Sequence, residues 1–137
     1  MKVVSVSHTS GDLIPLLLDE NGLPIPTPNE FVLSRRTLSH NTLTRNLREL
    51  SVFYRWLKKM KINFEDRISS LSFFTEAEVC GSMVESLRVE QDTPGKLGQK
   101  VVSPHTFNHR LMTVRQYLMW CIDVYIGSLP VAIAKNL

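Results

Sequence analysis

Arginine, asparagine, threonine and histidine side chains gather at two places in the sequence, each at the start of an expected helix, and further basic side chains follow the first place. Arginine and asparagine can form paired hydrogen bonds to base edges, while threonine bonds to either a base or a phosphate. The first turn of a helix adds free N–H groups that favour phosphates. The residues that we expect to contact phosphate, sugar or base are Asn41, Thr42, Arg45, Arg48, Arg55, Lys59, Asn108, His109, Arg110 and Arg115.

Motifs that carry out catalysis or hold a metal are not apparent. The sequence contains no glycine-rich phosphate loop, no His-Glu-x-x-His and no pair of Cys-x-x-Cys motifs. His105 and His109 are spaced i, i+4, which suits a metal, but no third ligand stands nearby. We therefore expect no catalytic residue, no metal, no cofactor and no small-molecule substrate for this chain.

The composition is that of one folded domain. A length of 137 residues fits a single domain, and a hydrophobic share of 43% is enough for a core. Cys80 and Cys121 are too few and too far apart for a disulfide framework, so we expect both to be reduced and buried. No apolar run approaches the roughly 18 residues of a membrane span, and residues 1–10 lack a secretory pattern. A cytoplasmic protein without a membrane partner is predicted.

The net charge of +3 conceals a strong segregation along the chain. Residues 1–34 carry −3 and residues 62–95 carry −5, whereas residues 35–61 carry +7 and residues 96–137 carry +4. Segregated charge creates local potentials that a net charge does not reveal. By itself this pattern fits a solvated basic surface as well as it fits a nucleic-acid surface.

The first group of polar residues must be positioned by a helix that we expect from about His40 to Met60, capped by Ser39. Its apolar residues lie on one stripe and its basic residues lie on the opposite side. Val52 and Trp56 stand on or beside the basic side, so part of that side could pack against another element. The apolar stripe consists of Leu43, Leu47, Leu50, Tyr54 and Leu57.

A second helix is expected after Thr75, which forms a capping box with Glu78. Its buried stripe is Val79, Met83 and Leu87, with Cys80 and Val84 beside it. Its exposed side is acidic and would be repelled by phosphates, so we expect this helix to lie away from DNA. Residues 62–73 are a candidate for a further helix, and residues 88–102 are a polar connection.

The last helix is expected to begin at Ser103 and Pro104, a cap followed by proline at the first helical position. Its second half, residues 117–126, is apolar nearly all round and is predicted to be buried. Gly127 is expected to end it, and Pro130 to discourage its continuation. Its main apolar stripe is Phe107, Leu111, Val114, Leu118, Cys121 and Tyr125.

The first 34 residues are expected to form an extended or β-hairpin arm that braces the helices. The turn-forming Asn21-Gly22 pair stands between the apolar segments 16–18 and 23–25, which predicts a hairpin there. Prolines 24, 26 and 28 then argue against a helix before about residue 30. The fold class predicted for the whole chain is all-α, with this arm attached.

Three stretches of the sequence resemble the core-binding domain of tyrosine recombinases, the phage-integrase family. Residues 38–62 are similar to the first helix of that domain, residues 103–122 to its last helix, and residues 16–34 to the strand-and-turn start of some bacterial members. In the first stretch the matching positions are Ser39, Thr42, Phe53, Trp56 and Leu57. In the second they are Thr106, Asn108, Arg110, Leu111, Val114, Arg115 and Tyr117.

The resemblance implies a small orthogonal helical bundle of the SAM-like type over residues 35–127, followed by a linker, residues 128–137, toward an absent catalytic domain. It implies double-stranded DNA at a recombination site as the partner, together with other recombinase protomers. The fragment itself would not be an enzyme, although its parent would break and rejoin DNA. Tyr54, Tyr117 and Tyr125 lie on expected helices, and none is proposed as the nucleophile of that reaction.

The alternative is an all-α protein-interaction module without affinity for DNA. In that case exposed Trp56, Met119 and Trp120 would form the partner surface. A free-standing helix-turn-helix repressor is disfavoured, because no two expected helices are joined by the short glycine-containing turn that the motif requires.

Overall fold

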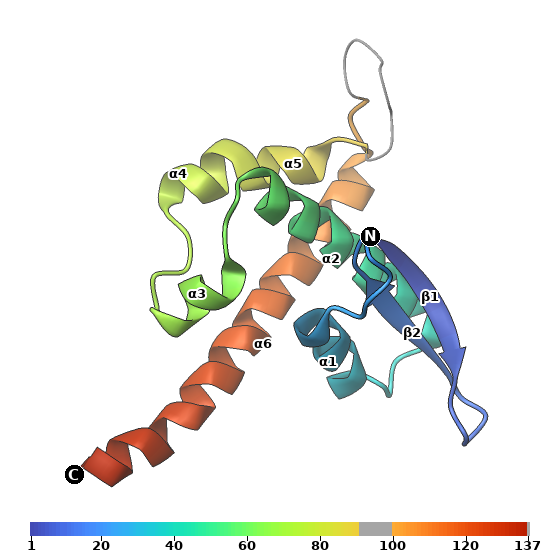
Figure 1. Ribbon diagram of the computed structural model, residues 1–137. Helices are drawn as coiled ribbons and strands as arrows, with labels where there is room; N and C mark the ends of the chain where they lie inside the picture. The colour runs from blue at the N-terminus through green and yellow to red at the C-terminus, as the bar shows by residue number, and fades with distance from the viewer. Residues whose placement is uncertain (91–99, 137) are drawn as a thin grey trace.

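The computed structural model describes residues 1–90 and 100–136 and is mostly helical, with one small antiparallel sheet (Figure 1). The long helix α6 runs diagonally across the molecule, with the strands and α1 on one side and α3 to α5 on the other. Part of the predicted connection, residues 91–99, lies outside the described residues. In chain order the elements are β1 (Lys2–Ser7), β2 (Leu13–Leu18), α1 (Pro26–Ser34), α2 (His40–Lys59), α3 (Phe64–Ser69), α4 (Glu76–Glu78), the π-helical turn η1 (Val79–Met83), α5 (Val84–Arg88) and α6 (Pro104–Asn136).

The N-terminal hairpin forms one turn earlier than predicted. Strands β1 and β2 pair from Lys2 with Leu18 to Ser7 with Leu13, across a turn in which Gly11 has a φ of 90°. The predicted Asn21-Gly22 turn is present, with a φ of 79° at Gly22, but it joins only a single bridge between Leu18 and Pro24. The residue types therefore predicted the position of this turn correctly, but the strands of the hairpin lie earlier in the chain than predicted.

Helix α1 overturns the prediction that the prolines exclude a helix before residue 30. Pro26 is its first residue and Pro28 lies in its first turn, where N–H groups have no intrahelical partner, so the prolines remove no helical hydrogen bond. The buried Asn29 side chain accepts from the Leu17 N–H (2.8 Å) and donates to the Leu17 carbonyl (3.1 Å). The segment 1–34 thus contains a β-hairpin, one of the two predicted forms, followed by a short helix, and both contact α2.

Helix α2 agrees with its prediction at both ends and on its apolar face. The Ser39 hydroxyl accepts from the Thr42 N–H, and the predicted leucines are buried in the core. Phe53, on the flank of the stripe, is fully buried among other aromatic rings. Tyr54 shares a 2.6 Å hydrogen bond with Tyr117 of α6, which joins the two longest helices.

The helical segment after Thr75 has the predicted capping box but not the predicted register. Met83 and Leu87 are buried as expected, whereas Cys80 is exposed. The cause is the π-helical turn η1, which accommodates an extra residue and rotates Cys80 away from the core. Cys121 is a buried free thiol as predicted, and α3 confirms the further helix expected within residues 62–73.

Helix α6 begins at the predicted Ser103 cap, but its buried stripe is rotated. Thr113, Val114, Tyr117 and Cys121 are buried, whereas Leu111 is 38% exposed. The rotation arises because polar groups of α2 and α5 draw Thr113 and Arg110 inward.

Two further predictions about α6 are wrong. Its second half is not buried all round, since Met119 is 53% exposed, and the C-terminal part of α6 extends beyond the other elements (Figure 1). The helix also continues through Gly127 and Pro130 to Asn136. Glycine and proline lower helix propensity but do not forbid a helix, so neither residue fixes the end.

The tryptophans do not form the exposed surface expected of an interaction module. Trp56 is only 3% exposed and donates from Nε1 to the Ser82 hydroxyl of η1 (2.9 Å). Trp120 is half-buried and packs against Phe31 and Tyr117. Of the three residues proposed for that surface, Met119 alone is exposed.

An arginine–carboxylate pair fastens α3 to α4. The Arg67 guanidinium donates to both carboxylate oxygens of Glu78, at 2.7 and 2.9 Å, and to the Phe73 carbonyl. This pair, with the Thr75 N–H, lowers the pKa of Glu78 to about 2. Because the folded-state pKa is depressed, the associated stability is present above the ordinary glutamate pKa and is lost as the pH falls toward 2.

We therefore expect Glu78→Gln to lower the melting temperature at pH 7 and to flatten its dependence on pH between about 5 and 2. Thermal unfolding followed by circular dichroism at several pH values measures both effects. Glu76→Gln is the matched control, because Glu76 is an exposed neighbour in the same short helix. An unchanged pH profile in Glu78→Gln would remove this pair as a source of acid sensitivity.

Candidate nucleic-acid interface

The side of α2 opposite the core is a second packing face with basic residues along its borders. Val52 and Trp56 lie at the centre of that side and are buried beneath η1, α5 and the start of α6. The sequence had left open that this side packs against another element, and it does. Arg45, Arg48 and Lys59 stay exposed, while Arg55 is half-buried.

A hollow of about 270 Å³ lies between α2 and the first two turns of α6. Helix α2 contributes Arg45 and Arg48, and α6 contributes His109 and Arg110, so four of the predicted contact residues meet here. His105 joins them, with its ring 4.3 Å from that of His109 between centroids. Positive charge and ring N–H groups around one opening suit an anion.

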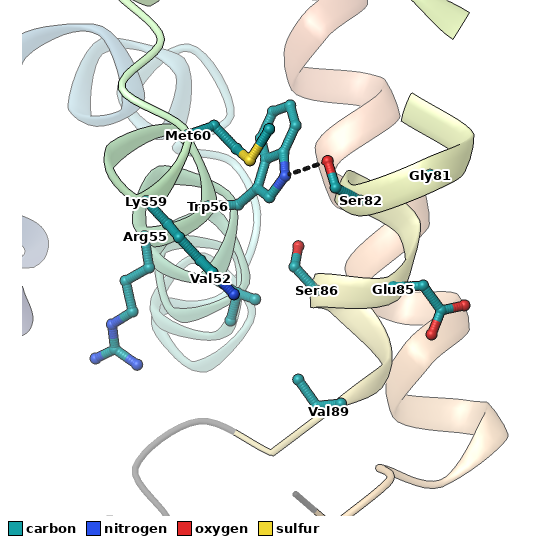
Figure 2. A pocket seen from close by; sticks show the side chains of 10 residues that line it. All are labelled: Val52, Arg55, Trp56, Lys59, Met60, Gly81, Ser82, Glu85, Ser86 and Val89. Carbon is teal, nitrogen blue, oxygen red and sulfur yellow. Dashed lines mark hydrogen bonds between the residues drawn. The ribbon is translucent and has the colours of Figure 1, made fainter. Parts of the chain in front are cut away.

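Two further hollows, each of about 410 Å³, continue along α2 and share Val52 with the first. One is lined by Lys2, Arg48, Arg55 and Arg110, and the other by Arg55 and Lys59 with residues of η1 and α5. Figure 2 shows the latter: the Trp56–Ser82 hydrogen bond bridges α2 and η1, and Arg55 extends to the side away from α5. We call the three neighbouring hollows, which share lining residues, the basic groove; its cationic side chains are Lys2, Arg45, Arg48, Arg55, Lys59 and Arg110.

Arg110 has a structural task in addition to its charge. Its Nη1 donates to the Leu87 carbonyl (3.0 Å) and to the Val89 carbonyl (2.9 Å), at the C-terminal end of α5. Partial burial lowers the pKa of the Arg110 guanidinium, which nevertheless stays protonated at neutral pH. Arg110 thus positions α5 against α6 while its charge lines two of the hollows.

A buried carboxylate, that of Glu49, also lines the hollow between α2 and α6. Glu49 accepts from the buried Thr113 hydroxyl at 2.9 Å and lies 3.6 Å from Arg45 Nε. The Thr113 hydroxyl also lies 3.5 Å from Oδ1, the side-chain amide oxygen, of Asn46. This polar cluster between α2 and α6 offsets part of the positive charge of the groove and holds Arg45 along the axis of α2.

The other predicted contact residues lie apart from the groove. Asn41 is exposed in the first turn of α2, and the Thr42 hydroxyl is engaged with the Ser39 hydroxyl at 2.9 Å. Asn108 and Arg115 are exposed and two turns apart on α6. Since α6 turns about 100° per residue, they share a side that Arg110 does not occupy.

Four residues at the site were absent from the predicted set. Lys2 reaches the groove only because the hairpin packs across α2, and no local pattern signals this. Glu49 of α2 and Thr113 of α6 are 64 positions apart in sequence, so their contact exists only because the two helices pack together. His105 could have been included, because it shares the i, i+4 side of α6 with His109.

The acidic side chains of the middle segment lie partly outside the basic groove and partly along it. Glu85 pairs with Arg88 at 3.3 Å and points to the far side of α5 from α2 in Figure 2. Glu76 is exposed on α4, outside the three hollows. Two acidic residues of this segment nevertheless line the basic groove: Glu85 lines the hollow that contains Lys59, and Glu90 lines the hollow that contains Lys2.

Comparisons of the chain with protein-family models, with curated proteins and with solved structures return no match. Among residues 1–90 and 100–136, no cluster of three histidine, cysteine or acidic side chains has the arrangement of a metal site. No helix in the described part of the chain is long and apolar enough to cross a membrane.

Proposed function

We propose that this chain binds double-stranded DNA through the basic groove, as the core-binding domain of a tyrosine recombinase of the phage-integrase family. The observation that carries the proposal is the convergence of Arg45 and Arg48 of α2 with His109 and Arg110 of α6 around one hollow. From Arg45 to Lys59 the helix advances about 20 Å, which is the length of several phosphates along one strand. Contacts to phosphates position such a domain, and the exposed Asn41, in the first turn of α2, is a candidate for a base or sugar contact.

The wider proposal follows from the sequence resemblance. The helices would form a SAM-like bundle in a cytoplasmic protein, acting beside other recombinase protomers at a recombination site in DNA integration. Bond breakage would belong to a catalytic domain of the parent protein, and this fragment would only bind. A coding sequence after Leu137 with a His-x-x-Arg motif and a later tyrosine would support the proposal.

Charge reversal in the groove tests DNA binding directly. We expect Arg48→Glu to weaken binding to duplex DNA about tenfold and to lower the slope of log affinity against log salt by about 1 or more, because phosphate contacts release counterions. Fluorescence anisotropy over a salt series measures both. The isolated domain should bind weakly and with limited sequence specificity.

Arg115→Glu is the matched control, with the same change of charge at an exposed α6 position outside the groove. We expect it to change the affinity less than Arg48→Glu. An equal loss in both variants would indicate a general effect of net charge and would overturn the groove as the binding surface. Unchanged binding in Arg48→Glu would have the same consequence.

The second candidate is a protein-interaction module, and the exposed apolar side of α6 is the observation that favours it. Leu111 is 38%, Met112 56% and Met119 53% exposed, and helical spacing places them on one side. Loss of a protein partner in Met112→Glu, with no DNA binding by the unaltered chain, would select this candidate.

A further inference from the structure

The outer edge of β1 is an unprotected strand edge. Within the described residues the sheet has two strands, and no backbone group outside β2 bonds to Lys2–Ser7. The strand carries no proline and no bulge, and its only charge, Lys2, stands at one end. Such an edge presents unpaired N–H and C=O groups in the geometry that another strand requires.

The register shows which groups these are. Ser5 lies opposite Pro15, which has no N–H, so this cannot be a hydrogen-bonded pair. The pair two residues along the strand, Val3–Leu17, is also non-hydrogen-bonded, because the Leu17 N–H and carbonyl point away from β1, to Asn29 and Ile25. Hydrogen-bonded and non-hydrogen-bonded pairs alternate, so the N–H and C=O groups of Val3, Ser5 and Ser7 face outward.

The opposite edge, that of β2, is protected in two ways. Pro15 presents no donor there, and both Leu17 backbone groups are occupied by the Asn29 side chain and the Ile25 N–H. Proline and covering contacts are devices that keep other chains from pairing with an edge. The contrast between the edges of this two-stranded sheet therefore singles out β1 as the one able to accept a strand.

We propose that β1 pairs with β1 of a second copy of this chain, antiparallel, to form a four-stranded sheet across a two-fold axis. The proposal does not depend on DNA binding. Antiparallel pairing of identical strands is generated by a two-fold axis, so an open edge is complementary to itself without further adaptation. The outward groups of Val3, Ser5 and Ser7 in one copy can form hydrogen-bonded pairs only with the same outward groups in the second copy. This requirement limits the possible registers of the pairing.

With Ser5 opposite Ser5 of the second copy, Val3 lies opposite Ser7, and about six hydrogen bonds form. Val4 then lies opposite Val6 in non-hydrogen-bonded pairs, where side chains approach most closely. Val6, now 40% exposed, would gain an apolar neighbour. The two Lys2 side chains lie at opposite ends of the pairing, about 20 Å apart along the strands, so their charges do not oppose association.

Amide hydrogen exchange resolved by residue tests the pairing. Between about 10 μM and 1 mM protein, we expect exchange at Val3, Ser5 and Ser7 to slow by about tenfold or more, while that at Lys2, Val4 and Val6 is protected throughout. Sedimentation should report a dimer over the same range. A chain that stays monomeric, with rapid exchange at Val3, Ser5 and Ser7 at every concentration, would overturn the proposal.

Ser5→Pro removes one outward donor and no hydrogen bond within the hairpin, so it should abolish dimerisation while the domain stays folded. Ser5→Ala is the matched control, because it keeps the N–H and loses only the contact between the Ser5 hydroxyl and His40. It should dimerise as the unaltered chain does. Dimerisation of a folded Ser5→Pro chain to the same extent would contradict the proposal.

The register has its own test in a Cys80→Ser background, which removes the exposed native thiol. Non-hydrogen-bonded antiparallel pairs bring Cα atoms to about 4.5 Å, within disulfide range. An equimolar mixture of Val4→Cys and Val6→Cys chains should therefore cross-link more than either variant alone. Equal cross-linking in all three samples would overturn the register.

Discussion

Replacing Phe53 by alanine should lower the free energy of unfolding by about 3–5 kcal/mol, the largest loss expected from a single substitution in this chain. Phe53 is fully buried, and its ring lies 5.6 to 6.3 Å between centroids from five others. Its truncation removes apolar burial and leaves a cavity among rings that cannot all shift to fill it. Since a domain of this size is stable by about 5–15 kcal/mol, most of the margin would be lost.

Urea unfolding followed by circular dichroism measures the change. Met119→Ala is the control, because Met119 is 53% exposed on α6 and its truncation should change the free energy of unfolding by less than about 0.5 kcal/mol. A loss below about 1.5 kcal/mol in Phe53→Ala would mean that the aromatic cluster is not the centre of the core.

The second large effect is expected at Arg110. Arg110→Met keeps much of the side-chain volume but leaves the carbonyls of Leu87 and Val89 without this donor. Hydrogen bonds from charged groups contribute about 1.5–3 kcal/mol, so we expect a loss of about 2–3 kcal/mol for this half-buried pair of bonds. Faster amide exchange near the end of α5 should accompany it, because Arg110 joins that end to α6.

Arg110→Lys separates the two roles of the residue. Lysine keeps the positive charge in the groove but lacks the planar fork of the guanidinium. Stability should therefore fall, while the salt dependence of DNA binding stays close to that of the unaltered chain. If Arg110→Met were as stable as the unaltered chain, Arg110 would serve only as a surface charge.

Local chemistry was sufficient to place most of the helix starts. Ser39, Thr75 and Ser103 each cap a helix in the structure as predicted, because a cap depends on residues within one turn of itself. The leucine stripe of α2 is likewise set by the helical repeat. The same logic misplaced α1, because the first helical turn tolerates proline and the prediction treated it as a breaker.

For the predicted DNA-contact residues, helix periodicity gave the side of the helix but not what packs against that side. Helix phasing correctly put Arg45, Arg48, Arg55 and Lys59 on the side of α2 opposite its core stripe, yet it could not show that Val52 and Trp56 between them would be covered. Arg110 and Arg115 were equivalent in the sequence, and only packing separates a residue that holds α5 from one that stays exposed.

The sequence by itself determined the helical character of the chain, the caps and the segregation of charge, and the DNA partner stays a proposal that starts from the sequence. Each of these depends on neighbours in the chain or on composition. Tertiary structure alone decided that Lys2, Arg48 and Arg110 line one hollow, that Glu49 is buried beside it, and that β1 has an open edge. These features are made by contacts between residues tens of positions apart, and no local periodicity carries information about them.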